Sequence, residues 1–210
     1  MPQFYLTRHG QTDWNRDNRI QGWAYTSINN TGQNQAHTLR KHLQQLSATP
    51  DTIYSSDLPR ARETTNILTE QGTLGNTSVT YHSDLRERNF GVYQGFNSDG
   101  FFERYPQYSI FDNGDLAAEK VPENGESYAS FDTRVQHVWT DICERHSDTD
   151  KTILIVTHGG VITLIVGKIL GYNYETSIKQ IDISNCSLTK IVDTGTQKDI
   201  DYVSKDSFLS

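Results

Sequence analysis

Cysteine is scarce in this sequence, and acidic residues outnumber basic ones. Its two cysteines, Cys143 and Cys186, lie far apart and form no Cys-x-x-Cys pair, which argues against a disulfide framework and fits reduced thiols in a cytoplasmic protein. The 26 Asp and Glu against 19 Lys and Arg give a net charge of −7. This charge argues against nucleic acid or an anionic membrane as the main partner, but a few arginines in a pocket can still hold a small anion.

Long hydrophobic runs are also absent. The most apolar stretch, residues 161–170, is too short to span a bilayer, and Met1 leads directly into strand-like residues without the features of a signal peptide. We therefore expect a cytoplasmic protein with no membrane partner, acting as a monomer or homodimer. The chain also lacks Gly-x-x-x-x-Gly-Lys-Ser/Thr and an Asp-rich cluster, which disfavours P-loop kinases and metal-dependent phosphatases. With no linker in 210 residues, we expect a single domain over 1–210.

Strand and helix patterns alternate along the chain. Apolar runs predict strands at 4–7, 52–55, 79–82 and 152–156, with late edge strands at 187–192 and 202–203. Helical spacing of apolar residues predicts helices at 31–46, 57–72, 128–142 and 159–170. This alternation predicts a three-layer α/β/α sandwich with a mostly parallel central sheet.

Local signals predict how several of these segments begin and end. Thr31-Gly32 can open the first helix, Ser56 or Asp57 can cap the second before Pro59, and Gly72 and Gly171 can end two helices. Residues 11–30 show no sustained period and are predicted to form a loop. Residues 96–124 are predicted to be an insertion or lid with one short helix at 101–105.

Two strands at opposite ends of the chain finish in His-Gly. Residues 4–10 read FYLTRHG, and residues 153–159 read ILIVTHG. Parallel strands present their carboxyl ends on one edge of a sheet, so we expect His9 and His158 to meet there. The positive charge of Arg8 should bias His9 toward its neutral, nucleophilic form, and its guanidinium can hold an anion. Alone, Arg-His-Gly is equally compatible with a solvated strand end.

Two further side chains could complete a site at this edge. Arg60, in the first turn of a helix, could point toward the edge or lie on a solvated helix face. Glu87 could donate a proton to a leaving oxygen, or be a solvated loop residue. Burial would favour its protonated form whereas Arg86 and Arg88 would favour the carboxylate, so the sequence gives no direction. Two histidines and two arginines on one edge suit phosphoryl transfer, in which an imidazole attacks phosphorus.

Four short motifs follow one another along nearly the whole chain. They are YLTRHGQT at 5–12 with WN at 14–15, R at 19 and QGW at 21–23; SDL at 56–58 with RA at 60–61; LRE at 85–87 with FG at 90–91; and VTHGG at 156–160. GES at 125–127 precedes a long helix. Together, in this order, they resemble the histidine phosphatase superfamily, the phosphoglycerate mutase-like proteins.

The resemblance implies the fold of that family and a role for each matching position. His9 would be the nucleophile that forms a phosphohistidine, and Glu87 would be the acid and then the base that activates water. The phosphoryl group would be surrounded by Arg8, Arg60 and His158, with Asn15 and the Gly159 amide as further phosphate contacts. Gln21 and Gly22 would lie near a small phosphorylated substrate. The resemblance implies no metal and no cofactor.

Within the family, the sequence favours hydrolysis over mutase activity. Mutases resemble one another in a His after the Glu-Arg pair, a Lys shortly beyond and an arginine pair in the insertion. Here Asn89 and Ser98 stand near the first two positions, and the insertion has no Lys or Arg between Arg104 and Lys120. The motifs resemble most the bacterial broad-specificity phosphatases. A cofactor-dependent phosphoglycerate mutase and a binding protein that retains only the pocket are the alternatives, although the latter would have lost catalytic residues that this chain keeps.

Two features bear on the substrate. Family members often have an Asp two residues after Trp23 and then Pro-Leu-Thr, where this chain has Tyr25 and then Ser-Ile-Asn at 27–29. The insertion and its borders are rich in aromatic residues: Phe96, Phe101, Phe102, Tyr105, Tyr108 and Phe111. These could form an apolar wall for the substrate, or only pack against the core and lid.

Overall fold

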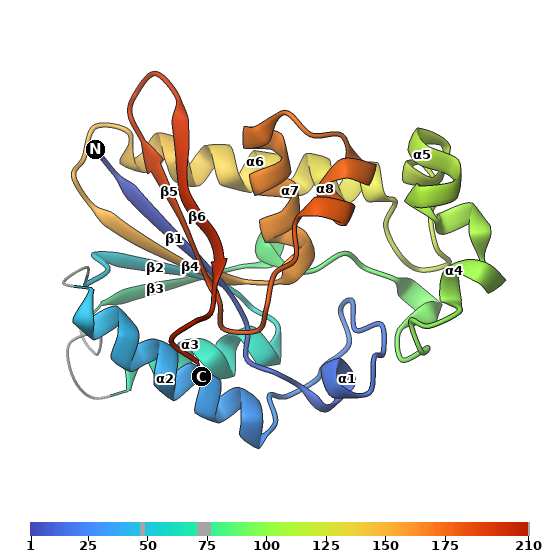
Figure 1. Ribbon diagram of the computed structural model, residues 1–210, viewed down its shortest axis with the longest axis horizontal. Coiled ribbons are helices and arrows are strands. Elements are labelled where there is room, and N and C mark those ends of the chain that lie inside the picture. The colour runs from blue at the N-terminus through green and yellow to red at the C-terminus, as the bar shows by residue number, and fades with distance from the viewer. Residues whose placement is uncertain (47–48, 71–76, 210) are drawn as a thin grey trace.

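A six-stranded mixed sheet forms the centre of the computed structural model, which describes residues 1–46, 49–70 and 77–209 (Figure 1). The strand order is β3-β2-β4-β1-β5-β6. The first four strands in this order are parallel to one another, whereas β5 is antiparallel to both of its neighbours, β1 and β6. The strands are β1 Gln3–Arg8, β2 Thr52–Ser56, β3 Ser78–His82, β4 Thr152–Thr157, β5 Leu188–Asp193 and β6 Lys198–Lys205. The prediction of a mostly parallel sheet is confirmed.

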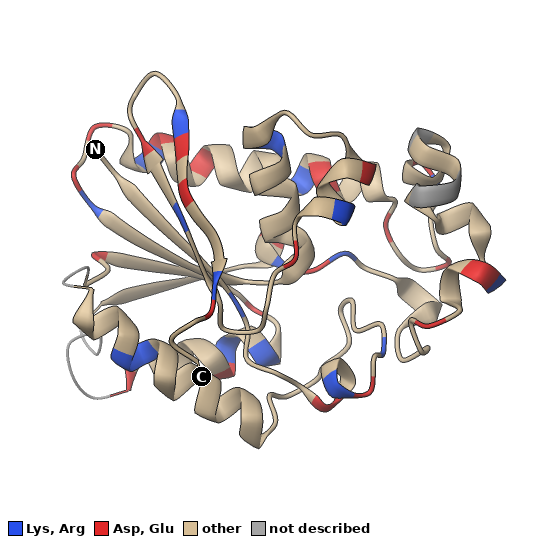
Figure 2. Ribbon diagram, in the orientation of Figure 1, with Lys and Arg blue, Asp and Glu red and all other residues tan. Residues whose placement is uncertain are grey.

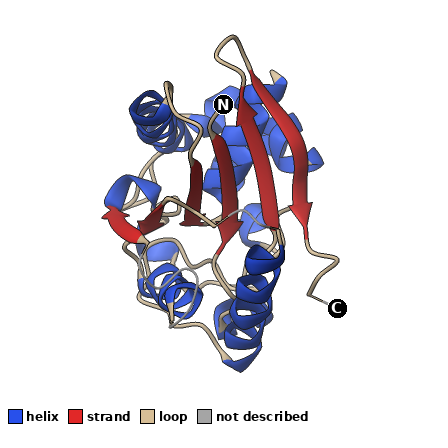
Figure 3. Ribbon diagram, turned by 90° about the vertical axis from the view of Figure 1, so that its left-hand side faces the viewer, coloured by secondary structure: helices blue, strands red, loops and turns tan. Residues whose placement is uncertain are grey.

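Helices cover both faces of the sheet, because the central strands are apolar on both sides (Figures 1 and 3). On β1, Phe4 and Leu6 pack in the core with α6 and α7, whereas Tyr5 packs in the opposite core with α2 and α3. The long helices are α2 Asn30–Gln45, α3 Pro59–Thr69, α6 Tyr128–His146 and α7 Gly159–Leu170. The predicted three-layer α/β/α sandwich is therefore confirmed.

Shorter helices lie mostly in the connections. They are α1 Asp13–Arg16, α4 Phe101–Arg104, α5 Ile110–Ala118 and α8 Tyr174–Gln180, with short 3₁₀ turns η1 Ser83–Leu85, η2 Gly91–Tyr93 and η3 Pro106–Tyr108. The segment predicted as an insertion or lid, 96–124, contains α4, η3 and α5 and lies at the end of the molecule opposite the N-terminus (Figure 1). No helix among the described residues is long and apolar enough to cross a membrane.

Several predicted boundaries were wrong. The helix after β2 has Leu58 as its N-cap and no side-chain cap, because the Ser56 hydroxyl bonds His158 and Asp57 pairs with Arg86. β5 is not an edge strand, since β6 pairs along its free side.

The predicted loop at 11–30 contains α1, which has a capping box between Thr12 and Asn15. The following helix begins one residue earlier than predicted, with Asn29 as its cap. Gly171 ends α7 in a left-handed conformation as predicted, whereas Gly72 lies outside the described residues.

Candidate active site

The carboxyl ends of β1 and β4 bring two histidines together. The parallel register pairs Arg8 with Thr157, so the next residue of each strand, His9 and His158, emerges at the same edge. Their ring centroids lie 5.2 Å apart, and both side chains are buried. The structure thus brings together the two His-Gly motifs, although they are separated by most of the chain.

Hydrogen bonds define the tautomer of His9. Nε of Arg60 donates to Nε2 of His9 at 3.1 Å, and a guanidinium can only donate. Nε2 therefore carries a lone pair, and the ring proton lies on Nδ1, which donates to the carbonyl of Gly10 at 2.8 Å. The amide of Asn185 also donates to the backbone carbonyl of His9 at 2.8 Å. The imidazole is neutral and fixed in orientation, and the electron pair on Nε2 accepts the hydrogen bond from Arg60.

The surroundings keep His9 neutral. Burial lowers its pKa well below the usual 6.5, and the positive charges of Arg60 and then Arg8 lower it further. Sequence reasoning named Arg8 as the cause, but burial has the largest effect, and Arg60 contributes more than Arg8. The depth of His9 below the surface depends on the packing of the loops around it.

Two buried polar atoms next to these rings are unused in the described part of the chain: Nδ1 of His158 and Nε of Arg8. Nε2 of His158 is bonded to the hydroxyl of Ser56 at 2.8 Å, and Nη1 of Arg8 donates to the carbonyl of Ile183 at 2.7 Å. Burial lowers the pKa of both side chains, and for His158 the neighbouring charges of Arg60 and Arg8 act in the same direction. Nε of Arg8 is a donor, and Nδ1 of His158 is a donor in the tautomer in which Nε2 accepts from Ser56, so a phosphoryl oxygen would fit both.

Arg60 points into the site and is 0% exposed, which excludes the alternative of a solvated helix face. Its outer nitrogens donate to two carbonyls in the loop after α1, those of Gly22 at 2.7 Å and Ala24 at 3.1 Å. Burial lowers its pKa to about 10, so it stays charged at neutral pH. Arg60 therefore supplies positive charge to the site and also holds the loop after α1 in place.

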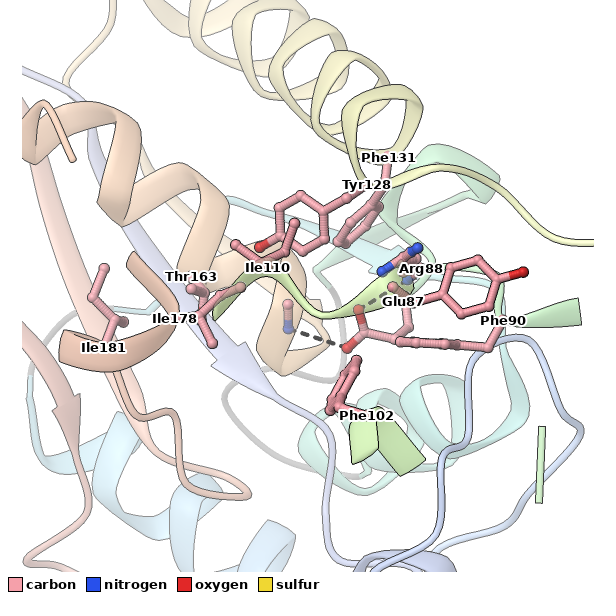
Figure 4. A pocket seen from close by; sticks show the side chains of 12 residues that line it. Glu87, Arg88, Phe90, Phe102, Ile110, Tyr128, Phe131, Thr163, Ile178 and Ile181 are labelled. Carbon is pink, nitrogen blue, oxygen red and sulfur yellow. Dashed lines mark hydrogen bonds between the residues drawn. The ribbon is translucent and has the colours of Figure 1, made fainter. Parts of the chain in front are cut away.

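The carboxyl group of Glu87 is held in place by two backbone amides. Arg88 donates to Oε1 at 2.9 Å, and Gly160, in the first turn of α7, donates to Oε2 at 3.1 Å (Figure 4). A Cβ at position 160 would lie only 2.3 Å from Oε1, so a larger residue there would displace the Glu87 carboxyl group. The second glycine of His-Gly-Gly therefore makes room for the carboxylate.

These side chains line a cavity of about 250 Å³, which we call the phosphoryl cavity. Its lining includes seven of the nine site residues inferred from the sequence: Arg8, His9, Asn15, Gln21, Gly22, Arg60 and Glu87. The other two do not line it, because His158 lies beneath the surface and Gly159 lies at the start of α7 against Arg8. Lys and Arg are spread over the molecule together with Asp and Glu (Figure 2). Arg8 and Arg60 bring positive charge to this cavity in an otherwise acidic chain.

Sequence reasoning missed the residues that hold Glu87 in place. Nε1 of Trp23 donates to the Glu87 carbonyl at 2.7 Å. Arg134, on α6, donates to the carbonyls of Asp84, Arg86 and Glu87 and pairs with Glu126 at 2.6 Å. The sequence signals were the QGW match at 21–23, which includes Trp23, and the GES match at 125–127, which includes Glu126. Nothing local to Arg134 indicates that it reaches back to this segment.

The aromatic residues of the insertion pack against one another, and two of them also line a cavity. Phe101 and Tyr108 are buried with Ile20, and Tyr105 packs against them. Phe102 and Tyr108 also line a cavity next to Glu87. The side chain of Phe111 is not among those described.

The positions that suggested hydrolysis are occupied by neutral groups. Asn89 accepts from Gly91 and donates to the Asn124 carbonyl, so its side chain is committed to a turn. Ser98 lines the phosphoryl cavity and bonds Asn18. Neither residue supplies a positive charge for a carboxylate.

Comparisons with known proteins agree with this geometry. Residues 4–206 match the model of the histidine phosphatase superfamily, branch 1. The broad-specificity phosphatase of Saccharomyces cerevisiae is 31% identical over 191 residues, or 91% of this chain and 79% of that protein. The 2,3-bisphosphoglycerate-dependent phosphoglycerate mutase of Bartonella bacilliformis is 30% identical over 175 residues, or 83% of this chain and 84% of that protein.

The fold agrees as well. The structure of YhfR from Bacillus stearothermophilus matches with a TM-score of 0.85 at 27% identity, over 100% of both chains. The chain therefore belongs to the histidine phosphatase superfamily and is a phosphoric monoester hydrolase of that family.

Proposed function

We propose that the protein hydrolyses small phosphomonoesters without a metal ion, through a phosphohistidine formed at Nε2 of His9. The observation that carries this proposal is the bond from Arg60 Nε to His9 Nε2, which leaves a lone pair on a buried, neutral ring inside a cationic cavity. Glu87 lies in the same cavity, where it can reach an oxygen of the bound ester.

In the first step, the phosphoryl group takes the place of His9 as the partner of Arg60. Nε2 attacks phosphorus, the N–P bond forms and the P–O bond to the alcohol breaks. Arg8 and Arg60, which line the cavity, hold the non-bridging oxygens, which carry more charge in the transition state. We propose that Nδ1 of the buried His158 donates to one of these oxygens once the phosphoryl group has entered. If the Ser56 hydroxyl donates to Nε2 of His158, the neutral ring keeps its proton on Nδ1, toward the phosphoryl group. The carboxyl group of Glu87 gives its proton to the leaving alkoxide.

In the second step, the same carboxylate takes a proton from water. The water oxygen attacks phosphorus, the N–P bond breaks and the electron pair returns to Nε2 of His9. Inorganic phosphate leaves, and Glu87 is protonated again, so the site returns to its starting state. Glu87 acts in both steps because its two oxygens are oriented by the amides of residues 88 and 160.

Hydrolysis, rather than transfer between two oxygens of one substrate, is supported by the residues at the positions where the family's mutases carry a His, a Lys and an arginine pair. A mutase must hold the substrate carboxylate while the phosphoryl group moves. Asn89 and Ser98 are neutral, and residues 105–119 include no Lys or Arg. We propose a cytoplasmic enzyme, since Cys143 and Cys186 are both free and buried.

The test is phosphate release in EDTA from a panel of phosphomonoesters, with a parallel phosphoglycerate mutase assay. We expect metal-independent release with little mutase activity, and a phosphorylated His9 after rapid quenching, detected by mass spectrometry. Mutase activity without net release would overturn the assignment of hydrolysis. Release without any phosphorylated histidine would overturn the proposed intermediate.

A further inference from the structure

A second cavity lies beside the phosphoryl cavity and has no part in the steps above. Its volume of about 300 Å³ lies at the lower end of the range for small-molecule sites. We call it the apolar chamber and define it by six of its lining side chains: Phe102, Tyr108, Ile110, Tyr128, Phe131 and Ile178. They come from α4, η3, α5, α6 and α8 and surround a space next to Glu87 (Figure 4).

Glu87 connects the two cavities. Glu87, Phe90 and Phe102 line both of them, so the carboxyl group lies at their boundary. In the proposed mechanism, the oxygen that leaves phosphorus must lie against this carboxyl group. The carbon skeleton attached to that oxygen then extends past Glu87, and the apolar chamber is the space on that side.

A buried arginine places a hydrogen-bond donor beside this apolar space. Arg88 lines the chamber, is 4% exposed, and its Nη2 has no hydrogen-bond partner among the described residues. Nε donates to the Glu126 carbonyl at 3.3 Å, and the guanidinium lies 4.9 Å from the ring of Phe90 and 5.5 Å from that of Tyr128. A buried donor without an acceptor is costly, and an oxygen atom on a ligand would satisfy it.

We propose that the apolar chamber binds the leaving group of the substrate. The preferred substrates are phosphomonoesters of alcohols that carry an apolar body of about ring size and an oxygen acceptor for Nη2 of Arg88. This inference rests on the proposed function, because only a leaving oxygen next to Glu87 directs the alcohol into the chamber. It assigns selectivity to residues outside the motifs that bind the phosphoryl group.

Four esters of primary alcohols test the proposal: ethyl, benzyl, 4-isopropylbenzyl and 4-acetylbenzyl phosphate. We expect kcat/KM for benzyl phosphate to exceed that for ethyl phosphate on the order of a hundredfold, because each methylene in an apolar pocket discriminates about tenfold or more. The acetyl and isopropyl groups have similar shapes, and only the first offers an oxygen, so we expect roughly a tenfold preference for it. Equal values within each pair would overturn the proposal.

A pair of variants on α8 locates the effect. Ile178→Trp should fill the chamber and reduce the benzyl-to-ethyl ratio of kcat/KM by about tenfold or more. Gln180→Trp adds the same bulk at an exposed position of the same helix and should keep the wild-type ratio. An unchanged ratio in Ile178→Trp would overturn the proposal. Hydrolysis of ethyl phosphate with no preference for benzyl phosphate would do so while leaving the proposed function intact, whereas no hydrolysis of any ester would overturn both.

Discussion

Two cavities meet at Glu87, and they differ mainly in the charge of the side chains that line them. The phosphoryl cavity is cationic, and its key side chains come from the end of β1, from α1 and the loop after it, and from the first turn of α3. The apolar chamber is lined mostly by aromatic and aliphatic side chains from the 96–124 segment and from α6 and α8. One cavity is built on the centre of the sheet, and the other on helices at its border.

In the function proposed above, the phosphoryl cavity carries out the reaction and the apolar chamber selects among substrates. The charged side chains of the phosphoryl cavity are fixed by hydrogen bonds to buried backbone groups, such as those from Arg60 to the carbonyls of Gly22 and Ala24. The aromatic and aliphatic side chains of the chamber hold their positions mainly by packing, which tolerates exchange of one apolar residue for another of similar volume. Changes in the phosphoryl cavity should therefore affect every substrate, and changes in the chamber only some.

The largest effect should come from His9→Ala. Without the nucleophile, we expect kcat to fall on the order of 10⁴-fold or more for all esters alike. Phosphate release and the thermal unfolding midpoint should be measured together, because the variant should remain folded. Activity within tenfold of wild type in a folded variant would mean that His9 is not the nucleophile.

Glu87 lies at the boundary between the two cavities, and the Glu87→Gln variant should lose more activity on esters with poor leaving groups than on esters with good ones. We expect a loss of about 10²- to 10⁴-fold for ethyl phosphate, whose alkoxide needs a proton to leave. The first step with p-nitrophenyl phosphate should be much less affected, because nitrophenolate leaves without one. Burst kinetics would measure this step for both esters, and equal losses would contradict the acid role.

Arg134 is not among the lining residues of either cavity, yet Arg134→Lys should slow catalysis. Lysine keeps the charge but cannot donate to three carbonyls and a carboxylate at once, so the segment bearing Glu87 should shift. We expect kcat on ethyl phosphate to fall about 10- to 100-fold with little change in KM, and a smaller fall on p-nitrophenyl phosphate.

The matched control for this prediction is Arg145→Lys, which changes an exposed arginine on the same helix. It should keep the wild-type rates. If Arg134→Lys slowed both esters equally, its role would be general stability rather than the positioning of Glu87. In combination with Glu87→Gln, Arg134→Lys should have little further effect.

The smallest effect concerns stability at low pH. The pKa values of His9 and His158 are lowered in the folded state, mainly by burial, whereas in the unfolded chain they stay near 6.5. The unfolded chain therefore binds more protons below pH 6.5, and the free energy of unfolding should fall by about 1.4 kcal/mol per pH unit for each histidine. Above pH 6.5 this contribution to stability is complete.

Urea unfolding of wild type and His158→Gln between pH 7 and 5.5 measures the contribution of one ring. The slope should be shallower in the variant by up to about 1.4 kcal/mol per pH unit. The difference between the two slopes is the useful quantity, since His42 and His146 also have lowered pKa values. Identical slopes would show that His158 is not held neutral by the fold.

Local sequence patterns alone predict the three layers of the fold and most of the residues that line the phosphoryl cavity. Alternating apolar runs specified strands and helices, because hydrophobic periodicity and turn residues act over a few positions. The two His-Gly strand ends and the Arg60 and Glu87 motifs supplied the chemical groups, and seven of the nine inferred residues line the cavity.

Other features of the site depend on contacts between residues that are far apart in the chain, so local patterns do not predict them. Burial, more than the neighbouring Arg8, makes His9 neutral. Arg134 reaches Glu87 from α6, and Ser56 is bonded to His158 rather than capping α3. The apolar chamber joins side chains as far apart in the chain as Phe90 and Ile178. Local patterns encode the period and ends of each element, whereas the packing of whole elements decides which side chains meet.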